Sequence, residues 1–178
     1  NCKSLAASAA KMGFKLIVRS LVSLHGTVIS STAIRQLIGN GMMEEAARML
    51  GRSYCLTGTV AHGNERGRLL GFPTANIELE DYNVAAPRSG VYMVKVWLGA
   101  STYYGMANVG KNPTFGDVER LRLEVNIFDF SGDIYGQEMT VVFMRHIRGE
   151  IKFPSIIALK EQLAADKETC RALIQAEK

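Results

Sequence analysis

The feature that most constrains the fold is a change in residue texture at Arg52. From residue 54 to residue 147 the chain is rich in β-branched and aromatic residues, and Gly, Pro, Asn or Asp interrupt it at intervals. Short runs of this kind, separated by turn residues, predict an antiparallel barrel or sandwich. We expect strands near residues 55–62, 91–98, 103–109, 121–130 and 139–147.

Helices are expected on both sides of this β-rich region. Before it, residues 6–11 favour a helix and residues 16–22 suggest one short buried strand. Two short helices follow, one between the N-cap hydroxyls of residues 30–32 and the stop at residues 39–41, the other from Met43 to Leu50 and closed by Gly51. After Pro154, apolar residues recur near one helical face, which predicts an amphipathic helix packed on the barrel.

Composition indicates an ordinary globular protein. The 178 residues are 47% hydrophobic and 21% charged, which fits one domain with an extra piece. The net charge of +4 is compatible with an anionic small ligand and too weak to indicate nucleic acid. Three scattered cysteines argue against a disulfide framework and for a reducing compartment. The three histidines lack metal-ligand spacing, which argues against a zinc site.

Targeting and membrane signals are not expected. No stretch of eighteen apolar residues exists, so the sequence predicts no spanning helix. The chain begins with Asn1 and its first residues do not resemble a secretory signal, so we expect a cytoplasmic protein that was cut from a longer one.

The densest candidate for chemistry is the segment GTVAHGNERGRLLGFPTAN at residues 58–76. Glycines let a backbone turn sharply and bring its N–H groups close to an anion, and Arg66 and Arg68 can add charge-assisted bonds to phosphate. The alternative for this part is a solvated Gly-rich hairpin. Thr74 and Asn76 then follow Pro73 and offer two hard neutral oxygens, which suit Mg²⁺ when nucleotide phosphates complete the site. Their alternative is a turn in which Thr and Asn cap the loop.

Two later segments carry weaker signals. In residues 121–127 apolar and polar residues alternate, so Glu124 lies on the polar face, where a carboxylate can act as general base for a hydroxyl. The alternative is a solvent-facing polar row. Residues 148–153 join the last strand to the final helix, and their cations and Phe153 can hold a flat heteroaromatic ring or simply anchor that helix. Residues 105–112 nearly match a P-loop, but Asn112 and Pro113 break the pattern, and we expect a turn with Lys111 at its edge.

Taken together, these segments resemble the riboflavin kinase family. The signature ending GFPTAN is followed, in that family's order, by GVY at 90–92, ANVG at 107–110, PTF at 113–115, Glu124 with FDF at 128–130, DIYG at 133–136 and RGEIKF at 148–153. The resemblance runs from about residue 51 to the C-terminus. It implies a mainly β fold, a six-stranded antiparallel Greek-key barrel with a C-terminal helix. It also implies transfer of the γ-phosphate of ATP to the 5′-hydroxyl of riboflavin, giving FMN and ADP.

The same resemblance implies residue roles. Thr74 and Asn76 would hold Mg²⁺ and the phosphates, and Glu124 would act as base on the riboflavin hydroxyl. Asn126 stands where many members carry His and is a candidate nucleotide contact. The remaining implied contacts are with ATP, at Gly58, His62, Gly63, Arg66, Arg68 and Tyr135, and with the flavin, at Arg148, Lys152 and Phe153.

The first fifty residues carry a second resemblance. ISSTAIR at 29–35, Gly41 and residues 46–52 resemble the end of the adenylyltransferase domain of bacterial bifunctional riboflavin kinase/FAD synthetases. This implies an incomplete, short α/β remnant at 1–51 and a kinase domain at 52–178, with FAD synthesis expected only from the full-length protein. We expect a monomer, with self-association possible through exposed apolar residues of the remnant such as Ile34, Leu37 and Ile38.

Two other readings of the barrel stay open. One is a catalytically idle flavin- or nucleotide-binding barrel, against which the joint presence of Thr74, Asn76 and Glu124 argues. The other is an oligonucleotide-binding barrel, which would need a basic groove with exposed aromatic residues. We expect small-molecule substrates, with no nucleic acid or membrane partner.

Overall fold

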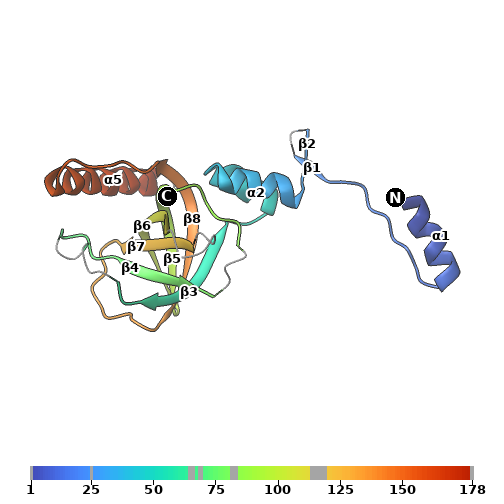
Figure 1. The fold of residues 1–178 in the computed structure, drawn as a ribbon, viewed down its shortest axis with the longest axis horizontal. Helices are drawn as coiled ribbons and strands as arrows, with labels where there is room; N and C mark the ends of the chain where they lie inside the picture. Colours follow the sequence, from blue (N-terminus) through green and yellow to red (C-terminus); the bar gives the residue numbers. More distant parts are fainter. Residues whose placement is uncertain are drawn as a thin grey trace.

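The computed structural model describes residues 2–24, 26–63, 67, 70–80, 84–112 and 120–176. Its centre is a closed, six-stranded antiparallel barrel in the order β3-β4-β7-β6-β5-β8 (Figure 1). The strands are β3 (Cys55–Ala61), β4 (Ala75–Leu79), β5 (Gly90–Leu98), β6 (Ser101–Asn112), β7 (Arg120–Ile127) and β8 (Glu138–Arg148). The predicted barrel is confirmed, as are the five strands expected from the residue pattern.

Strand β4 was not among the strands expected from the residue pattern. Its sequence ANIEL alternates buried and more exposed positions, but the pattern covers only five residues and begins two residues after Pro73. These residues were interpreted as part of a ligand-binding turn. Its pairing with β3 and β7 closes the barrel. Residues 105–112 form part of β6, so they make no P-loop, and Lys111 pairs with Leu121 near the end of the strand; residues 113 and 114 of the expected turn lie outside the described residues.

Helices α2 (Ser31–Gly39) and α3 (Met43–Leu50) cover one end of the barrel. Ser30 caps α2 by accepting a hydrogen bond from the Ala33 amide, as predicted, and Gly51 closes α3 in the left-handed conformation with φ 72°. The core cluster of the barrel includes Ile38, which is 1% exposed, and Met43 from these helices. The expectation that Ile38 is an exposed docking residue is therefore wrong, because the barrel itself covers it; Ile34 and Leu37 also pack against this core.

The hydrophobic core crosses the expected division between residues 51 and 52. Ala46 is fully buried among barrel residues, and the Glu44 carboxylate lies 2.6 Å from Nε of Arg145 on β8. A domain division at this point stays a prediction, while the packing makes α2 and α3 part of the barrel's core.

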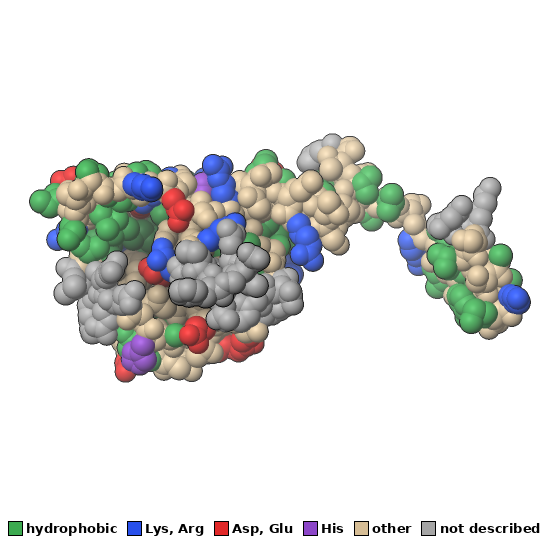
Figure 2. Space-filling view, in the orientation of Figure 1, with side chains coloured by type: hydrophobic (Ala, Val, Ile, Leu, Met, Phe, Trp, Pro, Cys, Tyr) green, Lys and Arg blue, Asp and Glu red, His purple; other side chains and the backbone are tan. Residues whose placement is uncertain are grey.

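The segment before α2 extends away from the barrel (Figure 1). Helix α1 (Cys2–Met12) confirms the expected helix, and a two-residue hairpin follows, β1 (Ser23–Leu24) with β2 (Thr27–Val28). The buried strand expected at residues 16–22 is wrong: Ile17 and Val18 are each 62% exposed and belong to no strand. The β-branched run predicts a buried strand; the Val22 carbonyl accepts a hydrogen bond of 2.9 Å from the Ile29 amide, but the Val22 side chain is 68% exposed, so this contact does not bury the run. Figure 2 shows hydrophobic side chains on the surface of this segment.

Helix α5 (Ile156–Ala176) packs on the outside of the barrel, as predicted. Cys170 and Ile174 from its buried face join a second apolar cluster with Val91, Met93, Met106 and Phe128. Burial raises the pKa of the Cys170 thiol to about 12, so this cysteine is a packing residue. None of the described helices is both long enough and apolar enough to cross a membrane.

Candidate functional site

The strand register places a row of polar residues across three neighbouring strands. Glu124 on β7 lies directly opposite Asn76 on β4 and, on its other side, opposite Asn108 on β6. Its flanking residues Leu123 and Val125 point into the barrel and are almost fully buried. The alternation therefore turns Glu124 outward, as the sequence predicted, and brings it beside one of the two residues expected to hold Mg²⁺.

The Glu124 carboxylate is accessible and lies near a cation. Its side chain is 29% exposed, and its Oε1 lies 3.7 Å from Nε of Arg122 on the same face of β7. Arg122 and Glu150 both lie near Gly110 of β6: a Cβ placed on Gly110 would lie 3.2 Å from Glu150 Oε1 and 3.4 Å from Arg122 Nη2. The alternation of residues 121–127 already places Arg122 on the face of Glu124, whereas Asn108 was not predicted as a neighbour, because only the barrel register brings β6 beside β7.

Two glycines bring the preceding loop onto Thr74 and Asn76. A Cβ on Gly63 would collide with the Asn76 side-chain amide, and one on Gly67 would lie 3.0 Å from Thr74 Oγ1. The Gly67 carbonyl also accepts hydrogen bonds from the amides of Leu70 (3.1 Å) and Phe72 (2.8 Å). The loop therefore needs glycine at these positions, because only glycine permits this approach.

The other predicted residues of this loop have different placements. Gly58 lies within β3, where a Cβ would collide with the Glu78 backbone, so its small size serves strand packing. Arg66 and Arg68 lie outside the described residues.

Asn126 holds the turn that carries Thr74. It is 5% exposed, and its Nδ2 donates a hydrogen bond of 2.7 Å to the Pro73 carbonyl oxygen. Its Oδ1 is buried and has no partner among the described residues. Asn126 lies on the polar face of β7, as the alternation predicted, but its burial there departs from the alternative of a solvent-facing polar row, because Pro73, before β4, lies against it.

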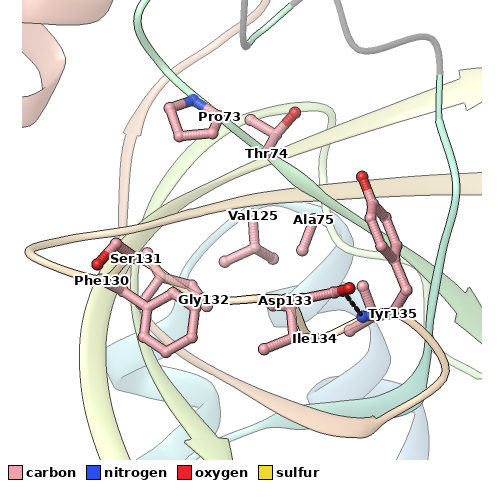
Figure 3. Close-up of a pocket in the computed structure, with 12 residues that line it drawn as sticks. Pro73, Thr74, Ala75, Val125, Phe130, Ser131, Gly132, Asp133, Ile134 and Tyr135 are labelled. Atoms are coloured by element: carbon pink, nitrogen blue, oxygen red, sulfur yellow. Dashed lines mark hydrogen bonds between the residues drawn. The ribbon is translucent and has the colours of Figure 1, made fainter.

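A pocket of about 500 Å³ opens beside Thr74 (Figure 3). In this view Pro73 and Thr74 lie along its upper edge, Val125 and Ala75 lie in the middle with Ile134 below them, and Phe130 and Tyr135 stand on opposite sides. The Asp133 carboxylate accepts a hydrogen bond of 3.1 Å from the Tyr135 amide. The His62 ring, directly after β3, stacks on Tyr135 with centroids 3.8 Å apart, so two predicted ATP contacts meet beside the pocket that Tyr135 lines. Apolar side chains line the inner part of the pocket and polar side chains lie at its rim. The pocket therefore suits a flat ring that carries phosphates.

The predicted flavin residues lie where β8 meets α5. Lys152 is exposed and Phe153 is half-buried. Arg148 is engaged with α5: its Nη2 lies 2.7 Å from Asp166 Oδ2, and its guanidinium stands 5.8 Å from the Phe153 ring centroid. Asp166 was not singled out in the sequence, because a single Asp inside a helix gives no signal.

The oxygen donors of the site suit Mg²⁺ when nucleotide phosphates supply the remaining ligands. Across the described ranges, no group of three or more His, Cys, Asp or Glu side chains could hold a metal ion. Asn76, opposite Glu124, and Thr74, two residues earlier, supply neutral oxygens, a donor set that suits Mg²⁺ bound partly by nucleotide phosphates.

Comparison with known proteins identifies the class. Residues 50–174 match the family model for flavokinase, described as riboflavin kinase, and the chain belongs to the riboflavin kinase family. The resemblance stated from the sequence is thereby confirmed.

The relatives are longer than this chain. Over 177 residues it is 44% identical to a bifunctional riboflavin kinase/FMN adenylyltransferase of Haemophilus influenzae, covering 99% of this chain and 56% of that protein. A protein of the same description from Listeria monocytogenes is 46% identical over 145 residues, 81% of this chain and 46% of the relative. The chain thus spans about half the length of these curated relatives.

One solved structure is also similar to this chain in sequence and fold. It is described as a macrolide-efflux protein from Streptococcus pneumoniae, with 44% identity and a TM-score of 0.82, and the match covers 93% of this chain and 54% of that one.

Proposed function

We propose that this chain is a riboflavin kinase that transfers the γ-phosphate of ATP to the 5′-hydroxyl of riboflavin. The observation that carries the proposal is the strand register, which sets Glu124 opposite Asn76, next to the glycine-supported Thr74. Phosphoryl transfer depends mainly on positioning and charge stabilisation, so a carboxylate beside oxygen donors and a nucleotide-sized pocket is a sufficient set of groups.

The proposed reaction balances without a further reactant. The riboflavin 5′-oxygen forms a bond to the γ-phosphorus, the bond from that phosphorus to the β–γ bridging oxygen breaks, and ADP leaves. The Glu124 carboxylate accepts the hydroxyl proton. Thr74 and Asn76 hold Mg²⁺ with the phosphates, and a bound Mg²⁺ neutralises phosphate charge. The pocket beside Tyr135 and His62 takes the adenine end of ATP, and Lys152 and Phe153 contact the flavin.

We propose that residues 1–51 correspond to the end of an adenylyltransferase region, with FAD synthesis expected only from the full-length protein. We also propose that the chain is a cytoplasmic monomer acting on small molecules. If the chain does self-associate, the contact would be made by the exposed residues of the N-terminal segment. These include Leu21 and Val22, which are 78% and 68% exposed. A sedimentation coefficient independent of concentration would support the monomer.

Two substitutions test the assignment of roles. Glu124→Gln should lower turnover by about 100-fold or more, the usual worth of a general base, while riboflavin binding is retained. Glu138→Gln, which removes an exposed carboxylate at the start of β8, is the matched control and should keep wild-type turnover. Turnover of Glu124→Gln within a few-fold of wild type would refute the base assignment.

The metal assignment has a separate readout. Thr74→Ala should raise the Mg²⁺ concentration needed for half-maximal rate, and Thr102→Ala, an exposed threonine on β6, should not. An unchanged Mg²⁺ titration for Thr74→Ala would favour the turn-capping role. No consumption of ATP in the presence of bound riboflavin would favour an idle binding barrel.

A further inference from the structure

A buried ion pair outside the phosphate-transfer residues joins β8 to helix α5. Asp166 lies in the middle of α5 and is 2% exposed. Both of its carboxylate oxygens lie 3.0 Å from Nε of Arg148, and Oδ2 lies 2.7 Å from Nη2 of the same residue. Gln162, one turn earlier, donates a hydrogen bond of 2.9 Å to Oδ1. Asp166 therefore has its acceptors occupied by two side chains, which gives this buried charge a fixed geometry.

Arg148 passes this restraint to the segment that connects β8 to α5. The Arg148 side chain is 18% exposed, and its Nη1 donates a hydrogen bond of 2.9 Å to the Gly149 carbonyl. Its guanidinium lies over the Phe153 ring at 5.8 Å from the centroid. Glu150, between these two contacts, lies near Gly110 of β6: a Cβ on Gly110 would lie 3.2 Å from Glu150 Oε1 and 3.4 Å from Nη2 of Arg122, the neighbour of Glu124. The Arg148 guanidinium thus contacts both ends of the segment 149–153, whose Glu150 lies near the end of the polar row.

Because Arg148 is already hydrogen-bonded within the protein, it has little capacity left to bind a ligand. Three of its nitrogens already donate to Asp166 or to the Gly149 carbonyl. A guanidinium neutralised in this way contributes little attraction to an anion or a ring dipole, whereas its planar fork is well suited to hold two elements at a set angle.

We propose that Asp166 is a positioning residue for riboflavin: it fixes Arg148, and through Arg148 it holds residues 149–153 in the conformation that receives the flavin. This inference rests on the proposed kinase function and adds to it the group that shapes the flavin side of the site. Asp166 touches no substrate in this account. Arg148 acts in the same way, so the direct flavin contacts fall to Lys152 and Phe153.

The test separates positioning from simple stability. Asp166→Asn keeps the size of the side chain and removes its charge, and riboflavin KM should rise at least fivefold while ATP KM stays within twofold. A purely structural role would lower the melting temperature and the active fraction but leave riboflavin KM unchanged. The matched control is Arg171→Gln, which breaks an exposed pair of the same helix with the barrel, 2.6 Å between Nη2 and Asp129 Oδ1, and should leave both KM values at wild type.

A double substitution tests whether the pair acts as one unit. Arg148→Gln should raise riboflavin KM as Asp166→Asn does, and the double variant should be no worse than the worse single variant. If Arg148→Gln raises riboflavin KM while Asp166→Asn leaves it unchanged, Arg148 contacts the flavin directly and the proposal is overturned. Should Asp166→Asn fail to fold, Gln162→Met removes only the supporting hydrogen bond and should raise riboflavin KM two- to threefold; an unchanged value would also overturn the proposal.

Failure of the kinase function is distinguishable from failure of this inference. Wild-type protein is first assayed for FMN formation. If it forms none but binds riboflavin, the kinase function fails, and the riboflavin Kd from flavin fluorescence replaces KM in every comparison above. If it neither forms FMN nor binds riboflavin, both proposals are refuted.

Discussion

Met43 on α3 gives a quantitative test of whether the two short helices belong to the barrel core. Its side chain has no exposed surface and packs within the main cluster of barrel residues. Fully burying a Met side chain is worth roughly 1.5–3 kcal/mol, and Met→Ala substitutions in cores cost about 2–5 kcal/mol once the residual cavity is included. We therefore expect Met43→Ala to lower the free energy of unfolding by about 3 kcal/mol.

The adjacent Met42 supplies the control. It is 43% exposed and has no side-chain capping bond, so Met42→Ala should cost less than about 0.5 kcal/mol, as is usual for surface positions. For a chain of this size, about 3 kcal/mol corresponds to a fall in Tm of roughly 6–12 °C, which circular dichroism would measure. Equal Tm values for Met43→Ala and Met42→Ala would refute the packing of α3 on the barrel.

Three further predictions address other parts of the structure. Asn126→Leu removes the hydrogen bond to the Pro73 carbonyl, so the Mg²⁺ requirement should rise as in Thr74→Ala while riboflavin KM stays within twofold; an unchanged Mg²⁺ titration would contradict this anchoring role. Burial, and then the Arg88 guanidinium, lower the pKa of His146 from its ordinary 6.5, with a backbone hydrogen bond to Ser89 opposing them. The unfolded chain then binds the proton more readily, so stability should fall as pH drops below about 6.5, and His146→Asn should weaken this dependence of Tm on pH. Removing residues 1–29 should leave Tm within about 2 °C of wild type, because the core begins in α2; a larger fall would place stabilising contacts in the N-terminal segment.

The barrel could be predicted because its longer strands carry their own signal. Alternation in residues 121–127 identified both the strand and the outward direction of Glu124, and the helix starts and stops at Ser30 and Gly51 follow local capping chemistry. Strand β4 was missed because five residues after a proline give too short a pattern. The strand expected at residues 16–22 failed for the opposite reason: a β-branched run needs a partner surface, and local sequence does not report one.

The site was predictable only in part, because its residues meet through register and packing. Thr74, Asn76 and Glu124 stand out as residue types in a pattern, and the register brings Asn76 beside Glu124. Arg122 lies near Glu124 because both stand on one face of β7, whereas Asn108 becomes a neighbour of Glu124 only when β6 pairs with β7. The partnership of Arg148 with Asp166 joins residues eighteen positions apart on different elements, and no local periodicity encodes it.

The most direct test of the kinase function is one incubation of the purified chain with riboflavin, ATP and Mg²⁺, with products separated and identified by mass. We expect FMN and ADP in equal amounts, with ADP formed only when riboflavin is present, and no FAD. Riboflavin that is bound but returned unphosphorylated would contradict it and leave a flavin-binding barrel.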